Sequence, residues 1–314
     1  MIRRVFALLG GGAALLTFAS CSTFDTDNAA TVNGTDITVD DLDAVRDDIA
    51  ANPDQFADAT DLDAAGAANG DLTRAVLSVL ANNVVARAVI AEAGAAVTDQ
   101  HLADARAALG AAAPDGPAID ALAERQALFT VLDELPAPEA TQLQAMYEER
   151  PAATGAVCIQ LVSADTEDAA ATTADALRAG EPVATSEGVE MQSGCFPVEQ
   201  LSGGLGAEEQ DLLLNGTPGD VSNPIPPDAA TGSPTWTVVR IQPWSDAEAG
   251  LTALFAGTSA DPSTPPPSAG RLALAGALVT ADVTVASEYG KWDQLSGSVV
   301  ALTPAAEDAT TGAA

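Results

Sequence analysis

The chain has 314 residues, which is enough for one or two domains with cores of their own. Asp and Glu number 45 against 12 Lys and Arg, a net charge of −33, yet hydrophobic residues make up 47%, which excludes a disordered acidic tail. A surface of this charge repels phosphate, so we expect no nucleic-acid partner. The single histidine, His101, excludes a multi-histidine metal site and a two-histidine catalytic centre, and we expect no metal and no cofactor.

The first twenty residues have the pattern of an export signal. Two arginines precede an apolar run over residues 5–16, which is too short to span a membrane comfortably. Small residues then precede Cys21, as in the cleavage signal of bacterial lipoproteins, although Phe18 stands where leucine is usual. This pattern predicts a signal peptide over residues 1–20 and an acylated Cys21 that anchors the chain to the outer face of the cell membrane. The alternative is an ordinary secretory signal followed by a chance cysteine.

Export also bears on the two remaining cysteines, Cys158 and Cys195. An even pair in an oxidising compartment is more often bridged than free, so we expect a disulfide; two buried free thiols are the alternative. We expect no later apolar stretch to be long enough to span a membrane. The rest of the chain is therefore expected to lie outside the cell.

A short tether over residues 21–29 precedes the first predicted element, a hairpin over 31–38. The Asn-Gly pair of the hairpin supplies the two positive-φ positions of a type I′ turn. Thr38, followed three residues later by Asp41, is a variant capping box, which predicts a helix over 39–52.

The strongest helical pattern covers residues 71–93 and follows a loop over 53–70. Its apolar residues recur four apart on one face, at Leu72, Val76, Leu80 and Val84. Further helices are predicted at 98–109, 117–135 and 138–149. We therefore expect residues 30–150 to form an all-α bundle with a hairpin at its start.

Beyond Pro151 the sequence predicts strands as well as helices. The predicted elements are strands over 157–162 and 236–241, a helix over 166–179 and a short helix over 207–214. Residues 181–194 contain no regular pattern. Two strands that flank helices predict a small α+β domain, which we place at 151–245.

The last segment of the predicted fold covers residues 246–304. It contains a proline-rich connector over 258–270, a helix over 272–278 and a short strand over 282–285. Residues 305–314 have the composition of a frayed tail.

The order of these pieces resembles the SurA-type and PrsA-type foldases, which are exported chaperones with a helical domain and an inserted parvulin-type peptidyl-prolyl isomerase domain. The motifs that carry the resemblance are ATVNGTDIT at 30–38 (similar to the family's A-x-V-N-G-x-x-I-T hairpin), TEDA at 166–169, SGCF at 193–196 (a reduced central glycine stretch), GDVSNPI at 219–225 (a G-x-V-S-x-P turn) and TWTVV at 235–239. Together they cover roughly residues 29–245.

The resemblance implies an α+β fold, in which an all-α SurA-N-like chaperone domain with small strands is joined to a parvulin-like α+β domain. It also implies that residues 246–304 return to the helical domain, with Asp282–Val285 or Val299–Leu302 paired to the strand around Val32. The partners it implies are unfolded or newly exported polypeptides.

Parvulin isomerases share two histidines, one on the first strand and one on the last. Those positions carry Cys158 or Ile159, depending on register, and Thr237, and no histidine lies within 151–245. We therefore expect no catalytic residue and no isomerase activity; the alternative is an active isomerase with a histidine-free site. In the parvulin fold the regions that carry Cys158 and Cys195 lie side by side, which favours the disulfide.

If a substrate groove is retained, the apolar candidates near its central turn are Phe196, Leu201, Leu205 and Trp236. The alternative for these four residues is packing in the core of the domain. The acidic clusters of the chain match no calcium-loop spacing, and the sequence contains no phosphate-binding or dinucleotide-binding motif.

Overall fold

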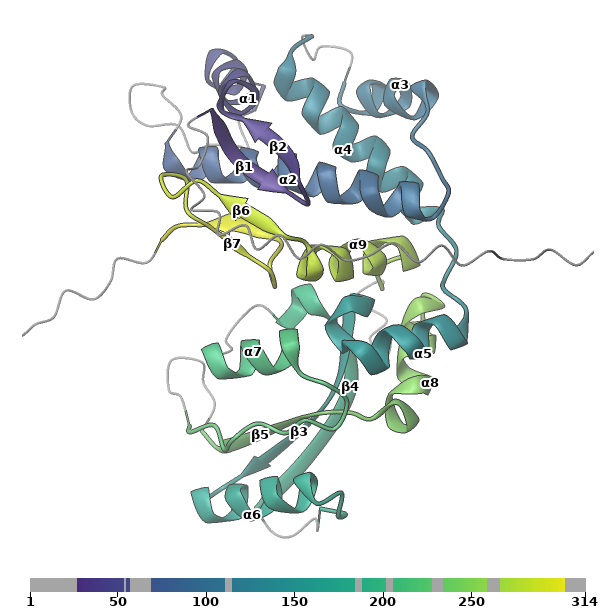
Figure 1. Ribbon diagram of the computed structural model, residues 1–314, viewed down its shortest axis with the longest axis vertical. Helices are drawn as coiled ribbons and strands as arrows, with labels where there is room; N and C mark the ends of the chain where they lie inside the picture. The colour runs from purple at the N-terminus through teal and green to yellow at the C-terminus, as the bar shows by residue number, and fades with distance from the viewer. Residues whose placement is uncertain are drawn as a thin grey trace, which may run out of the picture.

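The computed structural model describes residues 27–53, 55–56, 69–110, 115–183, 188–201, 206–227, 234–258 and 266–302. These residues form a mixed α+β structure with two units stacked along the longest axis (Figure 1). A helical unit occupies the upper part of that view and a sheet unit the lower part, with helix α9 between them. The predicted signal peptide, Cys21 and the predicted tail lie outside the described residues.

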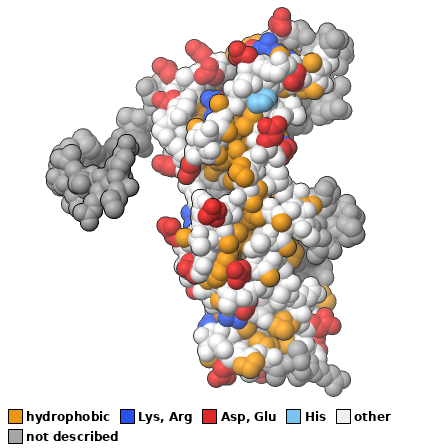
Figure 2. Space-filling model, turned by 90° about the vertical axis from the view of Figure 1, so that its right-hand side faces the viewer, with side chains coloured by type: hydrophobic (Ala, Val, Ile, Leu, Met, Phe, Trp, Pro, Cys, Tyr) orange, Lys and Arg blue, Asp and Glu red, His pale blue; other side chains and the backbone are white. Residues whose placement is uncertain are grey.

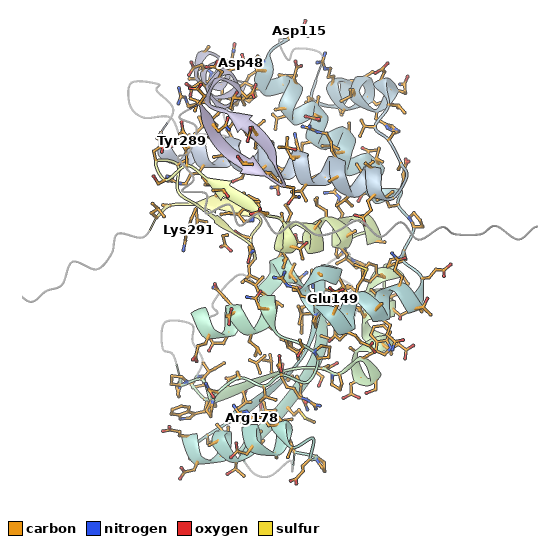
Figure 3. The ribbon with its side chains drawn as sticks, in the orientation of Figure 1. Asp48, Asp115, Glu149, Arg178, Tyr289 and Lys291 are labelled. Carbon is orange, nitrogen blue, oxygen red and sulfur yellow. A yellow bond between two sulfur atoms is a disulfide. The ribbon has the colours of Figure 1, made fainter. Side chains whose placement is uncertain are left out.

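The helical unit contains the helices that the apolar periodicity predicts. They are α1 (Val39–Ala51), α2 (Gly70–Glu92), α3 (Asp99–Ala108) and α4 (Pro117–Asp133). Thr38 Oγ1 accepts a hydrogen bond from Asp41 N at 3.1 Å, which completes the predicted capping box of α1. The carboxylate of Asp48 (Figure 3) accepts a hydrogen bond from Ala118 N at 3.0 Å and so satisfies the first turn of α4.

Helix α2 lies at the centre of the core of the helical unit. Leu77, Ala81 and Val85 are at most 1% exposed, and the helix contacts α1, α4, α9 and β1. The buried side chain of Asn83 donates a hydrogen bond to Ala121 O at 3.2 Å. By length and composition α2 is apolar enough to cross a membrane, which corrects the expectation that no such stretch follows the signal; a core helix meets the same criterion.

A three-stranded sheet in the order β2-β1-β6 joins the two ends of the described chain. Its strands are β1 (Asn28–Val32), β2 (Thr35–Thr38) and β6 (Val283–Val285). Asn33 and Gly34 have φ values of 50° and 78°, as a type I′ turn requires. Val32 pairs with Val283, so the predicted pairing of residues 282–285 with this strand is confirmed.

Val299, which belongs to the other candidate for that pairing, lies in a separate hairpin. Strand β7 (Lys291–Asp293) pairs there with β8 (Ser298–Val300), and Val299 N donates to Ser78 Oγ of α2 at 2.8 Å. Asn82 Nδ2, also on α2, donates to Gly297 O at 3.1 Å across a sequence separation of 215 residues. The C-terminal hairpin is therefore part of the helical unit.

Helix α9 (Ala269–Thr280) connects the two units through close backbone contacts. A Cβ atom added at Gly270 would lie 2.0 Å from Leu132 O of the helical unit. A Cβ atom added at Gly276 would lie 2.1 Å from Ala153 O of the sheet unit. Both positions therefore require glycine for steric reasons.

The sheet unit is built on an antiparallel sheet in the order β4-β3-β5. Its strands are β3 (Ala156–Ala164), β4 (Val189–Pro197) and β5 (Trp236–Ile241). Residues 219–225 lie along the other edge of β5, where Ser222 N donates to Val239 O at 2.8 Å. Arg178 (Figure 3) donates to Ser222 O at 2.8 Å and holds this segment in place.

Helices cover both faces of this sheet. They are α5 (Ala140–Glu149), η1 (Pro151–Thr154), α6 (Glu167–Arg178), η2 (Val198–Leu201), α7 (Ala207–Asn215) and α8 (Trp244–Phe255), where η denotes a 3₁₀ helix. Successive residues of β3 point to opposite faces. Ala156, Cys158 and Val162 therefore face α8 and α6, whereas Val157 and Ile159 face α7 and the two 3₁₀ helices.

Three parts of the sheet unit differ from the sequence prediction. Helix α5, which is expected in the all-α bundle of residues 30–150, packs instead on α8 and η1. Residues 189–194, for which no regular structure is predicted, belong to β4. This edge strand exposes Glu190, Met191 and Gln192, so its sequence lacks apolar alternation. Helix α8 is not predicted either, and it packs on β3, β4 and α5, although residues 246–304 are expected to belong to the helical domain.

Candidate functional site

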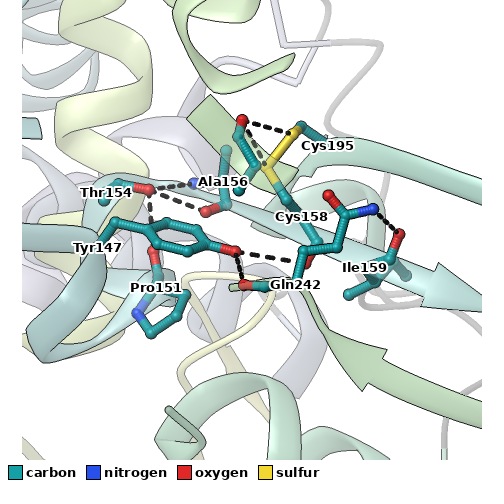
Figure 4. Close-up of a disulfide and its surroundings, with 9 residues drawn as sticks. Tyr147, Pro151, Thr154, Ala156, Cys158, Ile159, Cys195 and Gln242 are labelled. Carbon is teal, nitrogen blue, oxygen red and sulfur yellow. Dashed lines mark hydrogen bonds between the residues drawn. A yellow bond between two sulfur atoms is a disulfide. The ribbon is translucent and has the colours of Figure 1, made fainter. Parts of the chain in front are cut away.

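Cys158 and Cys195 form a disulfide, as expected for this pair. Cys158 lies on the central strand β3 and is directly opposite Cys195 on the edge strand β4 (Figure 4). Both sulfur atoms lie against α8, 3.9 and 3.8 Å from Ala247 O. A Cβ atom at Gly250 of α8 would lie 2.7 Å from Cys195 Sγ, so the helix packs directly on the bond. The disulfide therefore links two strands at the point where α8 covers them.

A buried tyrosine connects the same part of the sheet to α5. Tyr147 is fully buried, and its hydroxyl donates to Gln242 O at 2.9 Å, with Cys158 O 3.4 Å away (Figure 4). Burial raises the pKa of the Tyr147 hydroxyl above its ordinary value, so the group stays protonated and remains a donor. Gln242 Nε2 in turn donates to Ile159 O at 3.1 Å. These groups hold α5, β3 and the end of β5 together.

The structure does not bring the candidate groove residues into one groove. Phe196 is 36% exposed and points to the face of the sheet that carries α7, and Leu201 packs against the core on that face. Trp236 lies at the far end of the ladder, opposite Ala164, and packs against α6 on the other face. Leu205 lies outside the described residues. Of the three candidates that the structure describes, Phe196 and Leu201 therefore share a face of the sheet and Trp236 does not.

The residues that the resemblance assigns to the two histidine positions do not lie opposite each other in the sheet. Thr237 pairs with Ser163, whereas Ile159 pairs with Ile241 toward the other end of the ladder. Cys158 is held in the disulfide. Within the described part of the chain, no group of three or more His, Cys, Asp or Glu side chains could hold a metal ion.

The helical unit contains an apolar cavity of about 140 Å³ between α1, α2 and α4. The described side chains that line it are all apolar and include Val45, Ile49, Phe56, Val79 and Leu122. An apolar cavity of about 150 Å³ in a protein stays dry and binds benzene-sized groups. The chemistry and size of this cavity therefore match one apolar side chain.

This cavity is not predicted from the sequence. The predicted apolar stripe of α2 accounts for Leu72, Val76 and Leu80, which contribute to the cavity wall. Val79 lies beside that stripe and stays half-exposed. The sequence does contain one signal for the cavity, an apolar residue outside the buried stripe of α2. A single residue of this kind is common on protein surfaces, so it does not predict a cavity.

Comparisons with known proteins do not identify this chain. No protein-family model matches it, and no curated protein matches it significantly.

Proposed function

We propose that this protein is a lipoprotein, anchored through Cys21 at the outer face of the cell membrane, that binds unfolded or newly exported polypeptides. Its sheet unit is parvulin-like and does not catalyse prolyl isomerisation. The observation that carries the proposal is the layout of the chain, in which β6 returns to pair with β1 after the sheet unit. Motifs similar to those of SurA-type and PrsA-type foldases imply the same layout.

The apolar cavity supports a role in binding unfolded chains. Unfolded polypeptides expose apolar side chains, and their transfer from water to an apolar site is favourable. Figure 2 shows apolar side chains gathered along the middle of one face, on which Asp and Glu outnumber Lys and Arg. The net charge of −33 keeps a protein with such surfaces soluble.

The absence of catalysis is supported by the residues at the centre of the sheet unit. Rotation about a peptide bond has a barrier of about 18–20 kcal/mol, which an isomerase lowers in a shaped, partly desolvated site. Where parvulins have a histidine network, this chain has Thr237 opposite Ser163 and a bridged Cys158.

The proposal is tested by the aggregation of a chemically denatured client such as rhodanese. We expect the wild-type protein to suppress light scattering at near-stoichiometric ratios. Val79→Glu places a charge in the cavity wall and should abolish most of this effect. Ala88→Glu is the control, because Ala88 is exposed on α2 and lines neither the cavity nor its surroundings. Equal suppression by both variants, or none by the wild type, contradicts the proposal.

The lipid anchor is tested separately by Cys21→Ala in cells of an exporting bacterium. We expect the wild-type chain to incorporate labelled fatty acid and to sediment with membranes, because acyl chains add about 0.8 kcal/mol per buried CH₂ group. The variant should incorporate no label and appear in the soluble fraction. A variant that still sediments with membranes contradicts anchoring through Cys21.

A second candidate function is an active prolyl isomerase with a histidine-free site. The observation that favours it is the half-exposed ring of Phe196 on the same face as Leu201. A protease-coupled tetrapeptide assay separates the two functions. A rate above background that Phe196→Ala abolishes favours the enzyme, whereas a background rate favours the binding protein.

A further inference from the structure

A second hollow lies beside the apolar cavity and shares a wall with it. It is a groove of about 590 Å³ between α2, α4 and residues 296–301 of the C-terminal hairpin. Ala75 and Val79 of α2 line both the groove and the cavity. The two hollows are therefore adjacent on the helical unit, one wholly apolar and one lined by both polar and apolar groups.

The groove concentrates positive charge in a strongly acidic protein. Its described charged residues are Asp71, Arg74 and Arg125, which give it a net charge of +1 in a chain of −33. Arg74 forms an ion pair with Asp71. Arg125 forms no ion pair with any described residue and instead stacks on Phe129, with Cζ 5.1 Å from the ring centroid. One guanidinium of the groove is thus left without an anion.

The surroundings of Arg125 make a bound anion favourable. Burial and the neighbouring charge of Arg271 lower the pKa of the Arg125 guanidinium, which means that its environment disfavours the cation. Arg271 is itself neutralised by Asp133, with Nε and Oδ1 2.9 Å apart. An anion in the groove would offset the desolvation of Arg125 through a charge-assisted hydrogen bond.

Asn82 links the two sides of the groove. Its Nδ2 donates to Gly297 O at 3.1 Å and so ties α2 to the turn between β7 and β8.

We propose that the groove and the cavity together bind the C-terminal end of a polypeptide. The terminal carboxylate pairs with Arg125, and the apolar side chain of the last residue enters the cavity past Val79. This inference rests on the proposed binding of polypeptides and specifies which part of the client is recognised.

The test is calorimetric titration of the full-length protein with defined peptides. A decapeptide that ends in a free leucine should bind at least tenfold more tightly than the same peptide with a C-terminal amide, and more tightly than one that ends in a free serine. N-acetyl-leucine tests whether a small carboxylic acid is sufficient. If it binds as tightly as the decapeptide, the site recognises small acids, and the polypeptide part of the proposal is overturned.

Substitutions inside and outside the groove test whether the peptide binds there. Arg125→Gln should weaken binding of the free acid at least tenfold and abolish its preference over the amide. Ser296→Glu, an exposed change at the groove rim, should also weaken it, and so tests the site if the first variant is unstable. Arg106→Gln is the control, because Arg106 is an exposed arginine paired with Asp120 outside the groove. Equal affinity for acid and amide, or unchanged binding by both groove variants, would overturn the proposal.

Aggregation assays on the same preparations separate this inference from the proposed function. Suppression of rhodanese aggregation without a preference for the free acid rejects C-terminal recognition and leaves the chaperone role intact. Binding of the free acid without suppression supports C-terminal recognition and rejects the general chaperone role.

Discussion

The two units of this molecule are held together in opposite ways. The helical unit is completed by pairing of the two ends of the described chain: Asp282 N donates to Asn33 Oδ1 at 2.9 Å across 249 residues. The sheet unit is held by a disulfide between residues only 37 apart. The first unit therefore needs nearly the whole chain before its sheet is complete, whereas the second contains its own covalent link.

This contrast predicts the order in which the two units fold. Contacts between distant residues form slowly, because the entropy cost of closing a long loop comes before the contacts can stabilise the fold. The helical unit, which carries the apolar cavity, is therefore expected to be the later one to acquire its native structure. Tryptophans report on each unit, since Trp292 packs in the helical core and Trp236 and Trp244 pack in the sheet unit.

The largest expected effect comes from removing the disulfide. Cys195→Ala should lower the free energy of unfolding of the sheet unit by about 4 kcal/mol, because a loop of 37 residues is no longer closed in the unfolded chain. Urea denaturation monitored by Trp244 measures this loss. Ser193→Ala, an exposed change on the same strand, is the control. An unchanged midpoint, or a free thiol in the wild-type protein by Ellman titration, contradicts the role given to the disulfide.

Thr284→Pro is expected to destabilise the helical unit rather than the sheet unit. Thr284 pairs with Thr31, and the bonds at the flanking pairs indicate that its N–H points to β1. Loss of that donor leaves a carbonyl of β1 unpaired and should cost the helical unit about 2–3 kcal/mol, measured by the fluorescence of Trp292. Thr284→Val keeps the N–H and should cost little. A larger loss at Trp244 than at Trp292 would show that β6 does not complete the helical unit.

Gly276→Ala tests the connection between the two units. This substitution in a helix usually stabilises by about 1 kcal/mol. Here the new Cβ would lie 2.1 Å from Ala153 O, so the two units must move apart, and we expect a net loss of about 1–3 kcal/mol at the tryptophans of both units. Gly70→Ala is the control, because its Cβ meets only the mobile end of Arg74. A stabilised variant would mean that α9 does not pack closely on η1.

The smallest expected effect is that of Tyr147→Phe. Loss of the hydrogen bond to Gln242 O should lower the free energy of unfolding of the sheet unit by about 1–2 kcal/mol at pH 7. Because burial raises the pKa of Tyr147, its contribution is complete below about pH 10, the unfolded value, and is lost as the pH rises toward the folded value. The variant should therefore lose less stability above pH 10 than the wild type. Tyr289, whose pKa is also raised, is present in both proteins and contributes equally to both slopes. A variant with the wild-type alkaline slope contradicts this assignment.

Local sequence signals predicted most of the elements. The Asn-Gly pair placed the first hairpin, Thr38 placed the start of α1, and the four-residue apolar spacing placed α2. The pairing of β6 with β1 needed the family layout in addition, because a strand of three residues does not specify its partner.

The elements and sites that were missed lack such local signals. Strand β4 exposes four successive residues, Glu190 to Ser193, and contains Gly194, so neither apolar alternation nor a continuous apolar run is present. Helix α8 begins at the predicted end of the α+β domain, and most of it lies in residues 246–304, which the family layout places in the helical domain. The groove combines Arg74, Arg125 and residues 296–301, and only the fold brings positions so far apart in sequence together.

Two activities measured on one preparation of the protein test the central claim most directly. We predict suppression of rhodanese aggregation at near-stoichiometric ratios, sensitive to Val79→Glu, together with isomerisation of a proline-containing tetrapeptide at the uncatalysed rate. Catalysed isomerisation without any suppression of aggregation would contradict this claim.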